Sequence, residues 1–412
     1  MENDVNPQPT RGTERISLLD VYRGFAIFGI FVVNIVIMNS TFLNQDEFAK
    51  QWTSAIDQFS ERILQLFFYT KFFPIFSLLF GLGIAMQAVK LKENGNFSFS
   101  FFGRRMFILF LIGALHIIFL WSGDVLNLYA LLGLLVTVSI KRSNKLILSL
   151  ALFFILFPFY DPLFQSLFEL FHFRPESFLA VYDGAEVNRI ISRGSYMEGM
   201  VLRLREYMAN IPMLFGYLGP MALSMFLLGL YLGKNKIYNK LETFIDRIKK
   251  PLILLTLVTN AYRLIFLFLL PGYEWYSNPI LRPYLIKAMI VSDVLMGLFY
   301  LWLIGWLWYK TKFRFVLNPL KYAGRMALTN YIAQSVIGLF LFSSLGLSLY
   351  ETFSPSQSLL IAMGVFCFQV LYSKLWLSYF KYGPLEWAWR CLTYKKYIPL
   401  RKKREVKPGY IS

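Results

Sequence analysis

The chain has 412 residues, of which 57% are hydrophobic, 18% are aromatic and only 16% are charged. A soluble domain cannot bury so large an apolar fraction, so the composition excludes a soluble globular protein and predicts an integral membrane protein. The net charge of +18 does not indicate a nucleic-acid partner, because the basic residues form short clusters between apolar runs. We therefore expect an all-α polytopic protein surrounded by membrane lipids.

The apolar runs have the lengths that a bilayer imposes. Residues 1–19 are polar, carry two prolines and predict a disordered cytoplasmic leader rather than a cleaved signal peptide. A transmembrane helical domain is expected over residues 20–381. About ten spans are predicted within it, at residues 21–41, 66–88, 105–121, 125–140, 145–160, 211–233, 252–271, 285–309, 326–349 and 357–380.

The loops between these runs alternate in charge. Loops 122–124 and 350–356 contain no Lys or Arg, and loop 272–284 contains only Arg282. Under the positive-inside rule this alternation predicts that both the N- and C-termini are cytoplasmic. The loops of the other set carry the bases Lys90, Lys92, Arg104, Arg105, Lys141, Arg142, Lys145, Lys234, Lys236, Lys240, Arg247, Lys249, Lys250, Lys310, Lys312, Arg314, Lys321 and Arg325.

Two segments lie outside the spans. Residues 161–210 form a long extracytoplasmic loop, in which apolar residues recur at helical spacing from Val187 to Met208. This pattern indicates an amphipathic helix that lies on the membrane, caps a cavity or contacts a substrate. Residues 382–412 form a basic cytoplasmic tail suited to anionic lipid headgroups. Cys367 and Cys391 provide neither a disulfide framework nor a CxxC site.

The first span begins with charged residues. Asp20 and Arg23 are three apart and share a helix face, where they can neutralise each other or where Arg23 can meet a phosphate. The simpler interpretation is an Arg that snorkels at a helix end. Asn34 falls about 17 Å further along the helix, at membrane depth, so its amide requires a helix or a ligand as partner.

One of the two histidines lies in the third span. A tight hairpin can bring His116 and Asp124 together, which is the arrangement that a general base needs. Alternatively, His116 is a hydrogen-bonded interior residue and Asp124 caps the next helix. Neither interpretation includes a metal, because one His without clustered carboxylates or thiolates is a poor ligand set. His172, in the long loop, is expected at the surface.

Later spans carry further polar side chains. Arg263 and Asp293 are expected at similar depths in neighbouring spans, where they can form a buried ion pair or line a substrate cavity. Asn330 and Gln334 are four apart on one helix face, where they can join helices or line the same polar cavity. Gly81 and Gly83 permit close helix approach and are not part of a phosphate loop.

The order of these segments resembles a known family. LDVYRGFAIFGIFVVN, KFFPIFSLLFGLG, RRMFILFLIGALHIIFLWSGDVL, AGRMALTNYIAQS and GPLEWAWRCLTY occur in this order along almost the whole chain. In this they resemble the bacterial YeiB-like family, membrane proteins grouped as a domain of unknown function. The resemblance implies a multi-pass protein of the bacterial plasma membrane.

A more distant resemblance concerns chemistry. Asp20, Arg23, Gly24 and Asn34 match the first span of heparan-alpha-glucosaminide N-acetyltransferase and related transmembrane acyltransferases. That resemblance implies a cavity that admits acyl-CoA from the cytoplasm and passes the acyl group to an acceptor on the far side, with Asn34 near the reaction centre. In the acetyltransferase a histidine follows this Asn shortly afterwards, whereas MNSTFLNQDEF contains none. His116 is the candidate replacement.

These resemblances and residues give one leading hypothesis, a transmembrane acyltransferase that uses acyl-CoA and a cell-envelope, glycan or small-molecule acceptor. A transporter or lipid-handling protein is the alternative. A non-catalytic membrane component, such as a sensor or partner-binding scaffold, is the third interpretation. The hypothesis assigns the base to His116 with Asp124 and the oxyanion to Asn34, and it assumes that the first and third spans are neighbours. The cationic mouth for the CoA phosphates is assigned to Asp20, Arg23, Arg104 and Arg105.

Overall fold

The computed structural model describes residues 15–41 and 43–402, and within them the fold is all-α. Long apolar runs form the helices of the bundle, and shorter polar or amphipathic helices connect them. The α-helices are α1 Ser17–Asn39, α2 Gln45–Lys50, α3 Ala55–Ile63, α4 Phe72–Glu93, α5 Phe99–Phe119, α6 Leu126–Ser139, α7 Asn144–Leu156, α8 Tyr160–Leu170, α9 Gly184–Arg193, α10 Tyr196–Ala209, α11 Gly219–Lys234, α12 Leu241–Phe268, α13 Arg282–Lys310, α14 Arg314–Leu317, α15 Leu320–Arg325, α16 Ala327–Phe342, α17 Pro355–Tyr379 and α18 Pro384–Tyr394.

Helices occupy all ten predicted apolar runs, but they differ in length. Within the described residues, seven helical segments are long and apolar enough to cross a membrane, and a bent pair of helices makes an eighth. That pair is α7 and α8, which meet at 85° after Leu156. α6 and α16 have only 14 and 16 residues. The protein is therefore a multi-pass membrane protein, and the predicted count of ten depends on these shorter helices.

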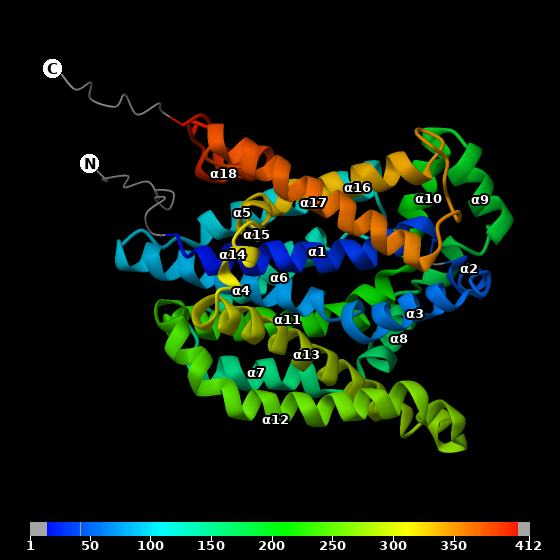
Figure 1. Cartoon of the computed structure of the whole chain (residues 1–412), viewed down its shortest axis with the longest axis horizontal. Helices are drawn as coiled ribbons and strands as arrows, with labels where there is room; N and C mark the ends of the chain where they lie inside the picture. Colours follow the sequence, from blue (N-terminus) through cyan, green and yellow to red (C-terminus); the bar gives the residue numbers. More distant parts are fainter. Residues whose placement is uncertain (1–14, 42, 403–412) are drawn as a thin grey trace.

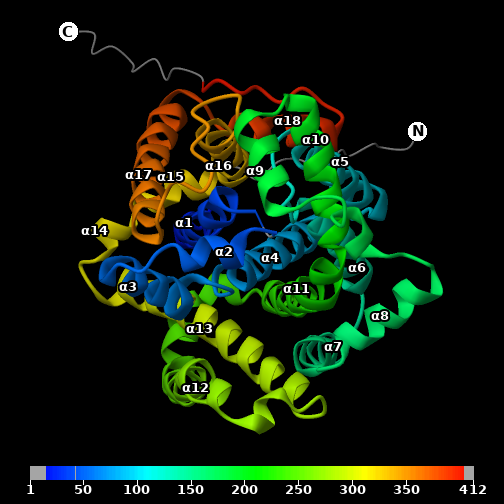
Figure 2. The same ribbon diagram turned by 90° about the vertical axis from the view of Figure 1, so that its right-hand side faces the viewer.

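The helices lie roughly parallel to one axis, in a bundle with two distinct ends (Figure 1). Seen from one end, α5, α16 and α17 lie on one side of α1 and α4, and α7, α12 and α13 lie on the other (Figure 2). α18 lies at one end of the bundle, whereas α2, α9 and α10 lie at the opposite end (Figure 1). We call these the α18 end and the cap end.

α1 runs through the interior of the bundle. It packs along α4, α15, α16 and α17, whereas α5 packs on α6, α10 and α18. α1 and α5 do not pack closely on each other, so close packing of the first and third spans is not found; Arg23 of α1 and Arg105 of α5 instead line one cavity. The contact between α1 and α15 is close enough to require glycine: a Cβ on Gly24 would lie 2.1 Å from the carbonyl oxygen of Leu320.

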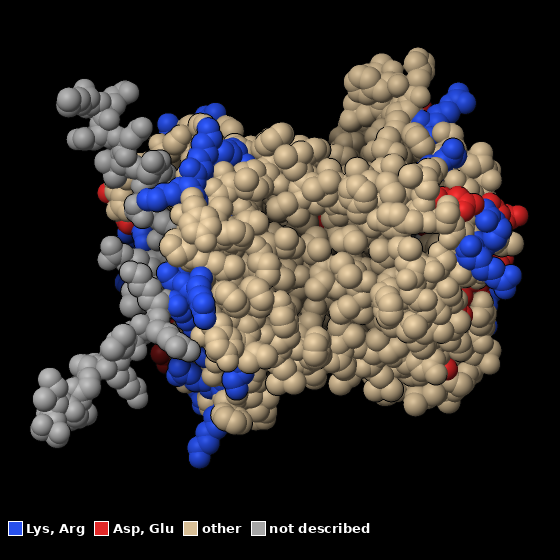
Figure 3. All heavy atoms as spheres, turned by 90° about the horizontal axis from the view of Figure 1, so that it is seen from above, with Lys and Arg blue, Asp and Glu red and all other residues tan. Residues whose placement is uncertain are grey.

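Charged residues gather at the two ends of the molecule. A band almost free of Lys, Arg, Asp and Glu crosses the middle of the face in Figure 3, as expected for a surface in contact with lipid acyl chains. Arg15 and Lys402, near the two limits of the described chain, line one cavity at the α18 end. The two described ends of the chain therefore lie on the same side, and the assignment of that side to the cytoplasm stays a prediction.

The segments outside the spans differ in detail from the sequence analysis. Helix begins at Ser17, inside the predicted leader, and residues 1–14 lie outside the described residues. The amphipathic pattern from 187 to 208 forms two helices, because Ser195 and Glu198 form a capping box that starts α10 after Gly194. The basic tail begins with α18, which packs on α5 and α16, and residues 403–412 lie outside the described residues.

Candidate functional site

A large cavity enters the bundle from the α18 end. It has a volume of about 1340 Å³. Its lining on α1 extends from Ile16 to Ile30, which corresponds to about 21 Å along a helix that rises 1.5 Å per residue. Among the described residues, nine Lys or Arg side chains and three acidic side chains line it, so the cavity is strongly positive. We call it the basic cavity.

Asp20 organises the mouth of this cavity. Its buried carboxylate accepts hydrogen bonds from Arg15 Nη2 and from Arg23 Nη1, each at 3.0 Å. The predicted pairing of Asp20 with Arg23 is therefore confirmed, and Arg15 joins it. Because a guanidinium has five N–H donors, Arg23 can hold this carboxylate and still present donors to the cavity, where its side chain keeps 28% of its exposure.

α18 forms one wall of the basic cavity. Trp389 and Tyr394 line the cavity, and the Arg105 guanidinium stacks 3.8 Å from the centre of the Trp389 ring. Arg104, the other predicted donor-binding residue on α5, is not part of this lining. Its Nε donates to the backbone carbonyl of Thr393, so that it fastens the end of α18 to α5.

Glu386 of α18 explains where α16 begins. Its carboxylate accepts hydrogen bonds from the backbone N–H groups of Leu328 and Thr329, at 2.7 and 3.0 Å, and from the Thr329 hydroxyl at 2.6 Å. These N–H groups are in the first turn of α16, which has no intrahelical partners for them. Burial raises the pKa of the Glu386 carboxyl. α18 is thus both the wall of the cavity and the cap of α16.

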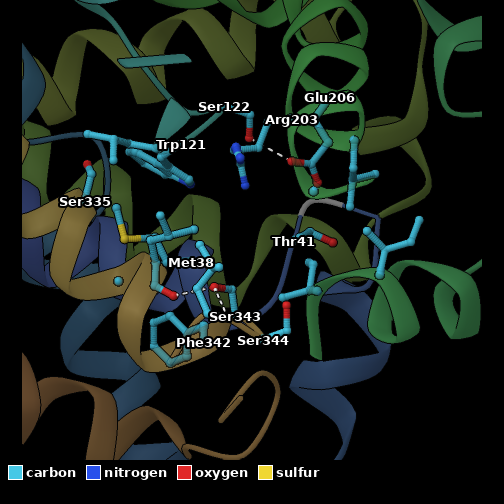
Figure 4. Close-up of a pocket in the computed structure, with 18 of the residues that line it drawn as sticks. Met38, Thr41, Trp121, Ser122, Arg203, Glu206, Ser335, Phe342, Ser343 and Ser344 are labelled. Atoms are coloured by element: carbon cyan, nitrogen blue, oxygen red, sulfur yellow. Dashed lines mark hydrogen bonds between the residues drawn. The ribbon is translucent and has the colours of Figure 1, made fainter. Parts of the chain in front are cut away.

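A smaller cavity of about 80 Å³ lies toward the cap end, beneath α9 and α10. Its lining includes Trp121 and Ser122 from the α5–α6 turn, and Ser335 and Phe342 from α16 (Figure 4). α9 and α10 contribute Ile190 and several neighbouring residues to the lining, so the prediction that this loop caps a cavity is confirmed. We call this the capped cavity.

The lining of the capped cavity includes one acidic side chain, Glu206, and one basic side chain, Arg203. Ser122 Oγ donates to Glu206 Oε2 at 2.8 Å, and Arg203 comes from the preceding turn of α10. Glu206 is only 5% exposed, and burial raises the pKa of its carboxyl to about 7. In Figure 4, Trp121 lies between this group and Ser335. Hydroxyl, carboxyl and guanidinium groups next to an indole ring suit a ligand rich in hydroxyls.

A buried polar chain centred on His116 lies between the two cavities. His116 Nδ1 lies 2.8 Å from Asp124 Oδ1, and His116 Nε2 lies 2.8 Å from Ser335 Oγ. Because a carboxylate only accepts, Nδ1 of the neutral ring donates to Asp124 and Nε2 accepts from the Ser335 hydroxyl. The predicted contact between His116 and Asp124 is confirmed. Tyr331 completes the chain with its hydroxyl 3.4 Å from Asp124 Oδ1.

Asp124 fulfils both of its predicted structural roles. While Oδ1 faces His116, Oδ2 accepts from the backbone N–H groups of Leu126 and Asn127, at 2.8 and 3.2 Å, and so caps the start of α6. Gly113 leaves room for this arrangement, because a Cβ there would lie 2.9 Å from Asp124 Oδ2. These backbone hydrogen bonds therefore fix the carboxylate in the position from which it orients the imidazole.

The two cavities share no lining residue. α16 and the α5–α6 turn contribute residues to both cavities, and on each of them the change from one cavity to the other occurs beside His116. On α16, Tyr331 lines the basic cavity and Ser335, one turn later, lines the capped cavity. In the α5–α6 turn, Ser122 faces the capped cavity and Val125 faces the basic cavity. Asp124 lies between these two. We call the layer formed by Asn34, His116, Asp124, Tyr331 and Ser335 the partition.

Asn34 reaches this layer from α1. Ile30 lines the basic cavity and Met38 lines the capped cavity, so Asn34, four residues from each, lies between them on the same helix face. Met38 meets α16 at Gly338, where an added Cβ would lie 2.4 Å from its Sδ. Among the described residues, no hydrogen bond joins Asn34 to His116, and Asn34 lines neither cavity.

Arg263 and Asp293 form the predicted buried ion pair, at 2.9 Å between Arg263 Nε and Asp293 Oδ1. Lys71 joins them at 2.9 Å from the same oxygen, and Thr70 donates to the other one. The Arg263 guanidinium also donates to the carbonyl of Leu66, in the middle of a π-helical turn that precedes α4. This cluster lines neither cavity. Its contacts hold α12 and α13 against the break before α4.

Asn330 and Gln334 join two helices. The Asn330 amide donates to Ser373 Oγ at 3.0 Å, and Gln334 donates to Gln369 at 2.9 Å, so α16 is bonded to α17. The predicted hydrogen bonding across helices is confirmed, and neither residue is part of the lining of the two cavities.

Several residues of the site were not identified from the sequence, among them Ser335, Tyr331, Trp389 and Glu206. Ser335 ends the AGRMALTNYIAQS segment, in which only the larger polar residues drew notice. Trp389 and Glu206 belong to segments assigned to a tail and a loop. A search for polar residues one helical turn apart on α16 would have found Ser335 next to Tyr331.

Comparison with known proteins places the chain in a family. The family model described as "Protein of unknown function (DUF418)" matches residues 232–396. An uncharacterized protein of Bacillus subtilis, YxaH, is 31% identical over an alignment that covers 97% of this chain and 99% of the relative. The chain belongs to the DUF418 family.

Two further relatives match almost end to end. YeiB of Escherichia coli is 27% identical over 95% of this chain and 99% of its own length, which confirms the YeiB-like resemblance. A 39.9 kDa protein of Bacillus acidopullulyticus is 28% identical over 95% of this chain and 98% of its own length. Within this DUF418 protein, the region that matches the family model contains Tyr331, Ser335, Glu386 and Trp389, and His116 lies outside it.

Proposed function

We propose that this protein transfers acyl groups across the plasma membrane of a bacterium, from acyl-CoA to an acceptor on the far side. One observation carries the proposal. A buried imidazole oriented by a carboxylate lies in a thin layer between a strongly basic cavity and a second cavity at the opposite end. An enzyme that joins a cytoplasmic anionic donor to an external acceptor requires these parts in this order.

The basic cavity suits coenzyme A. Its phosphates require cationic hydrogen-bond donors, which Arg15, Arg23 and Arg390 supply around the cavity. Its adenine requires an aromatic or guanidinium plane, which the stacked pair of Arg105 and Trp389 supplies. The thioester arm is narrow and largely apolar, and it would follow the deeper lining toward Tyr331. Arg104 is left out of this assignment because it binds α18.

His116 then acts as the base. A hydroxyl that attacks the thioester carbonyl gives its proton to Nε2, while Asp124 stabilises the imidazolium through Nδ1. The C–S bond breaks, and the proton passes to the departing CoA sulfur. The acceptor, a glycan, a lipid or a small molecule, places its free hydroxyl in the capped cavity, whose volume of about 80 Å³ holds only part of such a molecule.

The proposal is tested by the release of free CoA thiol from acetyl-CoA and from a long-chain acyl-CoA, with an extract of bacterial envelope as acceptor. We expect purified wild-type protein to release thiol, and His116→Ala and His116→Gln to be slower by about 10²–10⁴-fold, as is typical when a general base is lost. Arg23→Ala is expected to raise KM about tenfold, because it removes one charge-assisted contact.

The matched controls are His172→Asn and Arg247→Ala. His172 is an exposed histidine with a φ of 52°, a backbone conformation that Asn tolerates, and Arg247 is an exposed arginine away from both cavities. Both are expected to retain the wild-type rate. Thermal unfolding shows whether each variant is folded. Equal rates of thiol release from folded wild-type protein and folded His116 variants would contradict the proposal.

A transporter is the second candidate, and one observation favours it. Two cavities that lie toward opposite ends and are separated from each other by a polar layer also describe a carrier between two states. A carrier needs no base, so its activity would survive His116→Ala, whereas acyl transfer would not. The thiol assay therefore separates the two candidates.

A further inference from the structure

Ser335 is arranged like the nucleophile of a hydrolase triad. Its Oγ lies 2.8 Å from His116 Nε2, and His116 Nδ1 lies 2.8 Å from Asp124 Oδ1. Ser, His and Asp in this order and at these distances activate a serine hydroxyl, whatever the fold that presents them. All three are buried, and Ser335 is 1% exposed. A serine with only a packing role in α16 does not require a hydrogen bond from its hydroxyl to an imidazole.

Ser335 also lies at the boundary between the cavities. It lines the capped cavity, whereas Tyr331, about 6 Å earlier along α16, lines the basic cavity. A thioester carbonyl that reaches past Tyr331 therefore meets the Ser335 hydroxyl before it meets an acceptor in the capped cavity. An acyl group bonded to Ser335 would already face the acceptor side.

We propose that Ser335 carries the acyl group as a covalent ester between donor and acceptor. This inference rests on the proposed acyl transfer and adds a step to it. The acyl group crosses the partition while bonded to the protein, so no open passage has to connect the two cavities. The membrane stays sealed to ions during the reaction.

The reaction then has two balanced halves. In the first, Ser335 Oγ attacks the thioester carbonyl, His116 takes the serine proton at Nε2, the C–S bond breaks, and His116 returns the proton to the CoA sulfur. In the second, an acceptor hydroxyl in the capped cavity attacks the ester carbonyl of acyl-Ser335. His116 takes the acceptor's proton and returns it to Ser335 Oγ as the C–O bond to the serine breaks.

The test is acyl transfer to the protein itself, in the absence of acceptor. Purified protein is mixed with acetyl-CoA and quenched with acid, and both free thiol and the mass of the peptide that contains Ser335 are measured. We expect a burst of about one thiol per protein and an acetyl adduct on Ser335. Ser335→Ala is expected to abolish both.

Two variants exclude a structural explanation. Ser335→Cys keeps a nucleophile, so it is expected to carry the acetyl group as a thioester, which neutral hydroxylamine cleaves faster than it cleaves the wild-type oxygen ester. The control is Ser224→Ala. Ser224 is as buried as Ser335, donates a hydrogen bond to the Ala151 carbonyl and lines neither cavity, so this variant is expected to keep the full burst.

The outcomes separate this inference from the proposed function. Thiol release that depends on His116 and on acceptor, without a burst or adduct and at an unchanged rate in Ser335→Ala, overturns the covalent step and keeps acyl transfer. An adduct that persists in Ser335→Ala also overturns it. Absence of thiol release under every condition overturns both.

Discussion

Asp124 binds two unlike partners with the two oxygens of one carboxylate. Oδ1 orients His116, and Oδ2 caps α6. Each contact alone is a common structural feature, but together they couple the position of the imidazole to the start of a helix. This coupling fixes the ring nitrogen that faces Ser335, so the direction of proton transfer is set by the fold and not by the ligand.

Glu206 makes the stability of the protein depend on pH. Burial raises the pKa of its carboxyl to about 7, against about 4.3 in an unfolded chain. Between these values the folded protein holds a proton that the unfolded chain has lost. The contribution of Glu206 to stability is therefore complete below about pH 4 and is lost as the pH rises through 7, by on the order of 3 kcal/mol.

Glu206→Gln removes this titration while keeping an amide of similar size next to Ser122 and Arg203. We expect the melting temperature of the wild type to fall more steeply between about pH 5 and pH 8 than that of Glu206→Gln. Thermal unfolding of the detergent-purified proteins measures this difference. Parallel pH curves for the two proteins would show that Glu206 does not hold the proton.

Pairings within a short stretch of sequence could be predicted, whereas pairings through the bundle could not. The contacts of Asp20 with Arg23 and of His116 with Asp124 follow from a helical turn and a tight hairpin. Ser335 is 219 positions from His116, so their contact depends on the packing of α16, which no local pattern reveals. Arg104 and Arg105 are adjacent, and only the position of α18 separates their roles.

At the scale of helices, glycine determines how closely neighbours approach. Gly81 and Gly83 are both in α4, but a Cβ on Gly81 would lie 2.3 Å from the Phe226 carbonyl oxygen of α11, whereas a Cβ on Gly83 would face Arg23 at 3.8 Å across the basic cavity. The prediction that both glycines permit close helix approach is confirmed for Gly81 and wrong for Gly83. One helix thus uses one glycine for packing and leaves the other beside open space.

This contrast gives a matched pair of variants. We expect Gly81→Ala to destabilise the protein by about 1–3 kcal/mol, because the α4–α11 contact must open. Gly83→Ala is expected to be neutral or slightly stabilising, because alanine favours a helix over glycine by about 1 kcal/mol. Thermal unfolding of both proteins compares them. A larger loss in Gly83→Ala than in Gly81→Ala would contradict the packing described for α4.

At the scale of the whole molecule, the charge pattern and the two cavities have a common direction. The basic cavity opens at the end where Arg15 and Lys402 lie, and the capped cavity lies at the opposite end beneath α9 and α10. The alternation of basic loops predicts the first end to be cytoplasmic. Acyl-CoA, a cytoplasmic anion, would then meet the cavity whose charge attracts it.

The central claim is that the acyl group crosses the membrane while CoA does not. Inverted membrane vesicles expose the cytoplasmic face, so acyl-CoA labelled either in the acyl group or in CoA can be supplied at the basic cavity. With wild-type protein and His172→Asn, the account predicts that the acyl label becomes trapped inside the vesicles while the CoA label stays outside, and that His116→Ala traps neither. Entry of both labels together, or equal trapping of the acyl label by His116→Ala, would contradict it.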